Sequence, residues 1–259
     1  MTEAPPRDTA GVRLERDGPV ATVTLCRPDV LNAQTPQTWA ALRDIGRDLP
    51  GEVRVVVVRG EGRSFSAGLD LRVAQGDGGA VSALVEMPPE EAADRIAGYQ
   101  AGFTWLSRPD IISIAAVQGH AIGAGFQLAL ACDMRIATED AKFTMAEVSL
   151  GLVPDLAGTA PLVRLVGYAR ALEICATGRR VGADEALAMG LVNLVVPARD
   201  MDDAVRDLTA AVLAGARDAI VEIKALLSGA AAGRTGDDQL RAEREAQVRR
   251  VRDLAGLGE

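Results

Sequence analysis

Hydrophobic positions in the first fifty residues change from a strand period to a helix period. Residues 12–16 and 20–26 are rich in β-branched side chains, and Asp17-Gly18 between them tolerates positive φ, so this stretch predicts a β-hairpin. After a loop reading RPDVLNA, Thr35 stands before Pro36 in an arrangement that caps a helix. The apolar positions that follow recur at helical spacing: Trp39, Leu42, Ile45 and Leu49.

Two nearly continuous apolar runs predict strands that are buried on both faces of a parallel sheet. Residues 53–59 are mostly valine, and residues 111–117 form the second run. Between them we expect a polar, glycine-rich loop at residues 75–79 and a helix at residues 89–107. Further strands are expected at residues 135–138 and 191–196, and further helices at residues 161–166, 169–176 and 183–189.

Strands and helices alternate in the first three quarters of the chain, and only helical patterns follow. This order predicts an α/β core in residues 1–197 and a helical C-terminal region in residues 198–259, with a glycine-rich break at residues 228–236. The charged run at residues 241–253 is typical of a solvated helix or of one that packs against another subunit. A length of 259 residues suits one large domain, or one domain with a helical appendage.

Composition and charge narrow the functional class. The sequence is 48% hydrophobic and 25% charged, as in an ordinary globular protein, and its net charge of −8 argues against nucleic acid as a partner. Cys26, Cys132 and Cys175 lie in apolar segments without metal-ligand spacing, so we interpret them as reduced core residues. The first residues, MTEAPPRDTA, lack the pattern of a signal peptide, and no apolar run is long enough to span a membrane, so a cytoplasmic protein is expected.

Residues 117–133, VQGHAIGAGFQLALACD, carry the clearest chemical signal. They run from the end of an apolar strand through a turn containing Gly119, Gly123 and Gly125 into a helix that begins near Ala124. The first amides of this helix have no intrahelical partner and lie at the positive end of the helix dipole, where they suit an oxyanion. Glycine-rich turns also serve only to pack a helix tightly, and this stretch alone leaves both interpretations open.

Four segments in order, RPDVLNA, RSFSAGLDL, GHAIGAGFQLALACD and AEVSLGLVPD, resemble the crotonase family, also called the enoyl-CoA hydratase/isomerase family. The likeness covers residues 12–197. It implies an α/β, crotonase-like spiral of ββα units, assembled as a homotrimer or a dimer of trimers, which acts on acyl-CoA thioesters. It implies no metal and no separate cofactor, because coenzyme A is part of the substrate. Residues 198–259 would then serve trimerisation.

The resemblance places two backbone donors for the thioester carbonyl at Leu69, just after Ala67-Gly68, and at Ala124. Ala124 stands where the family often has glycine, but its amide is kept. Negative charge develops on the carbonyl oxygen when a proton leaves the neighbouring carbon or a nucleophile adds to a conjugated double bond. One preorganised donor contributes about 10²–10³ in rate to such a reaction.

Three side chains match the acid/base positions of the family: Gln127, Glu147 and Asp155. Gln127 lies one helical turn beyond Ala124, where typical hydratases have Glu, and an amide cannot take up a proton at neutral pH. Glu147 matches the second hydratase Glu, and Asp155 matches a carboxylate that some double-bond isomerases use. The resemblance therefore favours isomerisation, with Glu147 as the first choice for the base and Asp155 as the second.

Other interpretations of these positions stay open. A true hydratase would use Glu147 with Gln127 orienting the water, and a non-catalytic subunit would keep only acyl-CoA binding. Without the resemblance, Glu147 is typical of a solvated carboxylate at a strand end and Asp155 of a turn or cap residue. His120, the only histidine, has no nucleophile motif or second metal ligand nearby and is interpreted as structural.

The resemblance also assigns a coenzyme A site, in which backbone of two separate loops faces the adenine and a basic position lies near the phosphates. The positions assigned to it are Leu31, Ala33, Ser66, Ala67, Gly68, Asp70, Leu71 and Arg72. Arg72 is the basic position, and an ordinary surface charge is the alternative for it. The C-terminal family pattern EGxxAFxEKRxPxF has no counterpart in RDLAGLGE, so the contacts of that segment are not carried over.

Overall fold

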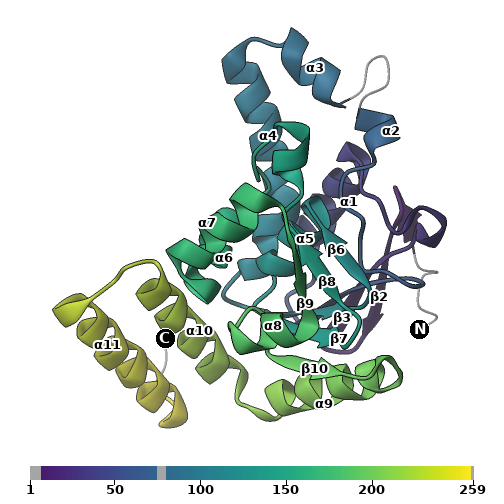
Figure 1. Ribbon diagram of the computed structural model, residues 1–259. Helices are drawn as coiled ribbons and strands as arrows, with labels where there is room; N and C mark the ends of the chain where they lie inside the picture. Colours follow the sequence, from purple (N-terminus) through teal and green to yellow (C-terminus); the bar gives the residue numbers. More distant parts are fainter. Residues whose placement is uncertain (1–6, 75–79, 258–259) are drawn as a thin grey trace.

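The first strands pair as the alternating pattern predicts, and a parallel sheet grows from them. In the computed structural model, which describes residues 7–74 and 80–257, seven strands form one sheet in the order β1-β2-β3-β4-β5-β7-β10 (Figure 1). The first three strands pair antiparallel, and the pairs from β3 to β10 are parallel. Their bounds are Arg7–Thr9, Val12–Asp17, Val20–Leu25, Val55–Gly60, Ile112–Val117, Met134–Thr138 and Leu194–Val196.

A second, three-stranded sheet stands beside the first and is made of short segments. It consists of β6 (His120–Ile122), β8 (Lys142–Thr144) and β9 (Arg180–Gly182), in that order. Strand β6 lies inside the glycine-rich turn, where the sequence predicted no strand. Isolated bridges join Ser66 to Ala121 and Gln34 to Leu69, so the loops around the sheets are held by backbone hydrogen bonds.

Helices connect the strands and cover both faces of the large sheet. Thr35 and Thr38 form a capping box at the start of α1, which confirms the predicted cap. The α-helices α1 to α11 are Pro36–Arg47, Leu71–Ala74, Ala80–Glu86, Pro89–Thr104, Ala124–Ala131, Thr159–Val166, Tyr168–Thr177, Ala183–Ala188, Met201–Ala214, Arg217–Ala231 and Gly236–Leu254. Four 3₁₀ turns, η1 to η4, are Pro28–Val30, Trp105–Ser107, Glu147–Leu150 and Ala198–Asp200.

The core is concentrated around α5, which lies at the centre of the molecule (Figure 1). Every residue from Ala124 to Leu130 is buried, so this helix is apolar all round as expected for a core helix, apart from Gln127. The opposite face of the sheet packs against α9 through Val57, Ile114 and Met201. Helices α10 and α11 form a hairpin that extends away from the core.

The predicted α/β core and helical C-terminal region are both observed, with local differences. Strand β10 begins only at Leu194, whereas Leu191 and Val192 are buried residues before it. Helix α10 continues to Ala231, so the predicted break is shorter, because alanine favours helix. The loop predicted at residues 75–79 lies outside the described residues, and α3 was not predicted. The domain boundary after residue 197 stays a prediction.

The cysteines only partly follow the expectation of core residues. Cys132 is buried, and burial raises the pKa of its thiol to about 12, whereas Cys26 and Cys175 are half-buried. Across the described helices, none combines the length and the apolar content needed to cross a membrane. No group of three or more His, Cys, Asp or Glu within residues 7–74 and 80–257 is arranged to hold a metal ion.

Candidate active site

Gly68 and Gly123 bring the backbone amides of the residues that follow them, Leu69 and Ala124, close together. Gly68 has φ +85°, and a Cβ at this position would lie 2.4 Å from the Ile122 carbonyl oxygen and 3.4 Å from the Ala124 nitrogen. Gly123 has φ +50° and forms the N-cap of α5, with its amide donating to the Thr144 carbonyl. A Cβ at Gly68 would clash with backbone, and Gly123 has a positive φ that other residues rarely adopt, so glycine at both positions lets the Gly68 turn pack directly against the N-terminus of α5.

Neighbouring hydrogen bonds fix the direction of both amides. The Gly68 carbonyl accepts from the Gln34 amide at 2.7 Å, and since C=O and N–H of a trans peptide point in opposite directions, the Leu69 amide points away from Gln34. The Gly123 carbonyl accepts from the Gln127 amide at 2.9 Å, so the Ala124 amide points out of the helix end. Neither amide donates to another group within the described chain. Such a pair suits an oxyanion.

Gln127 holds Glu147 beside this turn. The Gln127 side chain is 1% exposed, and its Nε2 donates to Oε1 of Glu147 at 2.7 Å. Its Oε1 accepts from the amides of Leu156 at 2.8 Å and Gly158 at 3.3 Å, which fixes the orientation of the side-chain amide. A Cβ at Gly123 would lie 3.3 Å from Oε1 of Glu147, so this carboxylate lies next to the N-terminus of α5.

Glu147 is a buried carboxylate without a cationic partner. Its side chain follows β8 at the start of η3, and it is 9% exposed, with Oε2 buried and without a hydrogen-bond partner in the described structure. Burial raises the pKa of Glu147, and the nearby Asp155 raises it further, while hydrogen bonds from Gln127 and the backbone partly oppose them. A carboxylate of this kind is suited to take up and return a proton.

Asp155 lies near enough to Glu147 to raise its pKa and has a similar environment. Burial raises the pKa of Asp155. Its backbone carbonyl accepts from Nε2 of Gln100 on α4 at 2.8 Å, and the loop that follows is held by Gln127. Two glutamines thus fix the segment that carries this carboxylate. The acid/base roles of Glu147 and Asp155 stay predictions.

The two loops assigned to coenzyme A lie side by side. Leu31 adopts a left-handed backbone, as does Asn32, and its carbonyl accepts from the Ala67 amide at 2.8 Å. Ser66 Oγ donates to the Asn32 carbonyl at 2.8 Å. The side chain of Asn32, which is buried, donates to two further carbonyls and stabilises this uncommon conformation.

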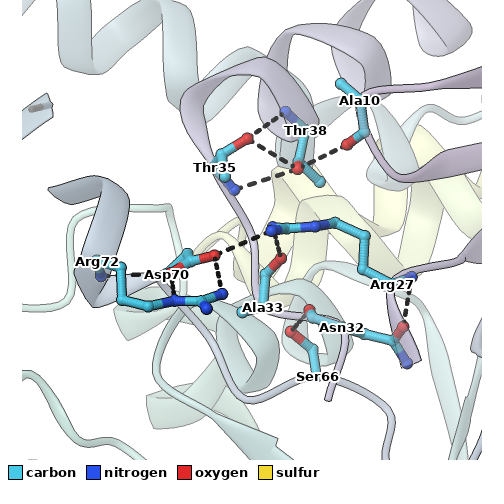
Figure 2. Close-up of polar contacts among 9 residues, drawn as sticks. All are labelled: Ala10, Arg27, Asn32, Ala33, Thr35, Thr38, Ser66, Asp70 and Arg72. Carbon is cyan, nitrogen blue, oxygen red and sulfur yellow. Dashed lines mark hydrogen bonds and ion pairs between the residues drawn. The ribbon is translucent and has the colours of Figure 1, made fainter. Parts of the chain in front are cut away.

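Two arginines enclose Asp70 at the open end of these loops (Figure 2). Arg27 donates to the Ala33 carbonyl at 2.7 Å and to Oδ2 of Asp70 at 3.0 Å, and Arg72 donates to both oxygens of Asp70 at 3.3 Å. These hydrogen bonds, from Arg72 first and then Arg27, lower the pKa of Asp70. Leu71 begins α2 and is exposed. The contacts of all these positions with coenzyme A stay predictions.

Sequence reasoning missed Arg27 and did not foresee how Gln127 is held. A cation at the end of a predicted strand, directly before Pro28, was the available signal for Arg27. No local signal identified Leu156 and Gly158 as donors to Gln127, because they lie far along the chain. His120 lies in β6, half-buried, with Nδ1 buried and without a hydrogen-bond partner in the described structure. Its structural role stays an interpretation.

Comparisons with known proteins identify the family of this chain. The sequence profile of the enoyl-CoA hydratase/isomerase family matches residues 15–253. Carnitinyl-CoA dehydratase from Salmonella enteritidis PT4 (strain P125109) is 39% identical over 217 residues, which are 82% of this chain and 78% of that protein.

Solved structures give the same result for the fold. A candidate enoyl-CoA hydratase from Thermobifida fusca YX superposes with a TM-score of 0.90 at 47% identity, over 95% of each chain. A structure of such a protein from the same organism in complex with CoA gives a TM-score of 0.88 at 48% identity, over 95% of each chain. A third structure, in complex with acetoacetyl-CoA, gives a TM-score of 0.89 at 46% identity, over 94% of this chain and 96% of the other. The predicted crotonase-like fold is confirmed, and this chain belongs to the enoyl-CoA hydratase/isomerase family.

Proposed function

We propose that this enzyme isomerises the double bond of an enoyl-CoA, with Glu147 as its proton carrier. The arrangement of Gln127 is the observation that carries the proposal. Its oxygen accepts from two backbone amides and its nitrogen donates to Glu147, so position 127 supplies no group that can exchange a proton. Glu147 is a buried carboxylate that lies beside Gly123, next to the N-terminus of α5.

The chemistry requires one base and an oxyanion site. Glu147 removes a proton from a carbon of the acyl chain, and the electron pair of that C–H bond moves through the conjugated system onto the thioester oxygen. The amides of Leu69 and Ala124 stabilise this dienolate. Glu147 then returns the proton at a different carbon, which shifts the double bond without any other reactant. Asp155 is the second candidate for this proton transfer.

Reversible hydration is the alternative, and two observations favour it. The nitrogen of Gln127 has two hydrogens, and its hydrogen bond to Glu147 uses one of them, which leaves a donor for water. The Salmonella relative is named a dehydratase. A subunit that only binds acyl-CoA is less well supported, because binding alone requires no buried carboxylate with a raised pKa beside the amides.

A panel of thioesters tests these functions against one another. Short 2-enoyl-, 3-enoyl- and dienoyl-CoA substrates are incubated with the enzyme, and water addition and double-bond migration are measured separately. Isomerisation predicts interconversion of 2-enoyl- and 3-enoyl-CoA that is faster than formation of 3-hydroxyacyl-CoA. Faster water addition supports the hydratase alternative. Binding of every thioester without either reaction would contradict both.

We also propose a homotrimer or a dimer of trimers in solution. Helices α10 and α11 expose large apolar side chains, among them Ile223, Leu227, Val248 and Val251, which is unusual for helices that face only solvent. Light scattering at micromolar concentration is expected to give a trimer or a multiple of it. A stable monomer or a simple dimer would contradict this assembly. The cytoplasmic location stays a prediction.

A further inference from the structure

The Leu69 amide depends on a short backbone ladder for its direction. Gln34 donates from its amide to the Gly68 carbonyl at 2.7 Å and accepts at its own carbonyl from the Asp70 amide at 2.8 Å. These two bonds fix both peptide planes that flank Leu69. Any sliding of residues 66–70 relative to residues 31–34 therefore rotates the Leu69 amide.

A guanidinium closes the open end of this ladder. Arg27 lies directly before η1 and donates from Nη1 to the Ala33 carbonyl, next to Gln34, and from Nη2 to the carboxylate of Asp70, next to Leu69 (Figure 2). Its planar fork thus spans both strands of the ladder. Asp70 is 4% exposed, so its carboxylate faces the protein and not a solvent-exposed ligand.

We propose that Asp70 is a positioning residue for the oxyanion site, acting through the Leu69 amide with Arg27 as its partner. The proposal rests on the proposed function, because it assigns a role within the same site. The isosteric change Asp70→Asn removes the charge that Arg27 requires, which loosens the ladder and turns the Leu69 amide. Ground-state binding of coenzyme A depends much less on this amide than the transition state does.

Arg72 allows this role to be separated from phosphate binding. Both arginines contact Asp70, but the Arg72 side chain is 73% exposed and that of Arg27 only 30%. One carboxylate neutralises a single positive charge, so the pair of arginines leaves a net positive charge on the exposed side. Arg72→Met is therefore expected to weaken the binding of substrates that carry phosphate. Asp70→Asn is expected to impair polarisation of the thioester carbonyl in every substrate, with or without phosphate.

The test combines spectroscopy with substrate truncation. A cinnamoyl-CoA thioester with an electron-donating ring substituent shifts its absorbance to the red when its carbonyl is polarised, and no turnover is needed. We expect the wild type to produce this shift and Asp70→Asn and Arg27→Met to lose most of it. In turnover, both variants should lower kcat by about tenfold or more, which is part of the rate factor of about 10²–10³ that one oxyanion donor contributes. The KM value should change less than about twofold, because ground-state binding depends less on this amide.

The second part of the test compares acyl-CoA with acyl-pantetheine, which lacks the nucleotide phosphates. Asp70→Asn should lower kcat equally for acyl-CoA and acyl-pantetheine, whereas Arg72→Met should raise KM for acyl-CoA alone. Asp48→Asn is the matched control, because Asp48 pairs with Arg47 on the surface, away from the site. Circular dichroism establishes that each variant is folded, and Arg27→Met carries the test if Asp70→Asn does not fold.

Each outcome separates this proposal from the proposed function. A wild-type red shift that Asp70→Asn and Arg27→Met leave unchanged would overturn the positioning role, and so would a wild type without any shift. If the wild type shifts the spectrum but catalyses neither isomerisation nor hydration, the proposed function fails. Loss of the shift in the variants would then still support the positioning role of Asp70. Effects on KM for acyl-CoA only would make Asp70 a phosphate-site residue instead.

Discussion

Asp70 and Glu147 are both buried carboxylates within the same site, yet their surroundings are opposite. Two arginines enclose Asp70 and lower its pKa, whereas Glu147 has one amide partner and a neighbouring carboxylate, and burial raises its pKa. The arginines stabilise the ionised form of Asp70, which suits the positioning role proposed for it. Burial favours the protonated form of Glu147, which suits the proton transfer proposed for it. Charge compensation, and not burial alone, sets the direction in which each pKa moves.

The largest expected effect comes from removing Glu147, the proposed general base. Glu147→Gln should lower kcat and kcat/KM together by about 10²–10⁴, the usual contribution of a well-placed general base. Acyl-CoA affinity should be nearly unchanged, because the groups proposed to hold the thioester are the amides of Leu69 and Ala124 and the Arg72 region, and not Glu147. Steady-state kinetics combined with calorimetric binding of an acyl-CoA measures both quantities.

Asp155→Asn is the matched variant for this prediction. Its effect should be smaller or dependent on the substrate, because Glu147 is the carboxylate that lies beside Gly123, the N-cap of α5. If Glu147→Gln keeps more than about a tenth of the activity, well short of a typical general-base loss, while Asp155→Asn abolishes it, Asp155 is the principal base.

Stability should respond to pH with opposite signs at the two carboxylates. The folded pKa of Asp70 is lowered, so its ion pairs stabilise the protein above the unfolded pKa of about 3.9, and this stability is lost as pH falls through the folded pKa. Asp70→Asn should therefore destabilise by roughly 1–3 kcal/mol at pH 7.5, less than a fully buried pair because both arginines are partly solvated. The difference should shrink in acid.

The contribution of Glu147 to stability should depend on pH in the opposite direction. Its folded pKa is raised, so its favourable contribution is present below the unfolded pKa of about 4.3 and is lost as pH rises through the folded pKa. Glu147→Gln should consequently increase stability at pH 7.5 and have little effect in acid. Urea unfolding of both variants at one protein concentration measures these differences. A loss of stability in both variants at pH 7.5 would show that Glu147 has a compensating cation.

Gln127→Glu should increase hydration of a short 2-enoyl-CoA by about tenfold, below the full contribution of an acid–base group. The new carboxylate keeps one oxygen on the amides of Leu156 and Gly158, and its other oxygen faces Glu147 across the present 2.7 Å contact. Two carboxylates at this distance share one proton, which restores a second proton-transfer group. An unchanged or lower rate with intact CoA binding would show that other residues exclude water from the pocket.

The smallest expected effect is a displacement of the acidic limb of the pH profile. The kcat/KM value should fall as Glu147 becomes protonated, at a pH above the ordinary range of Glu because burial raises its pKa. Gln127→Met removes a hydrogen bond that lowers this pKa, so the limb should move to higher pH. A limb that moves to lower pH would contradict the assignment of Glu147 as the titrating base.

Local sequence was sufficient for most of the fold, and the family resemblance supplied the candidate site residues apart from Arg27. The valine run of β4, the capping residues of α1 and the glycines around Ala124 act through backbone preferences and periodicity, which depend on near neighbours. The short strand β6 was missed because three residues inside a glycine-rich turn have no detectable period. They become a strand only by pairing with β8.

Only the tertiary structure decided in which direction the pKa of each carboxylate moves. Asp70 and Glu147 are both acidic residues that begin a helical turn, and the sequence placed Asp70 among ligand contacts. The groups that separate them come from distant segments: Arg27 lies 43 residues before Asp70, and Gln127 lies 20 residues before Glu147. A pKa depends on charges and burial in space, so it becomes defined only when the chain has folded and brought these groups within a few ångströms.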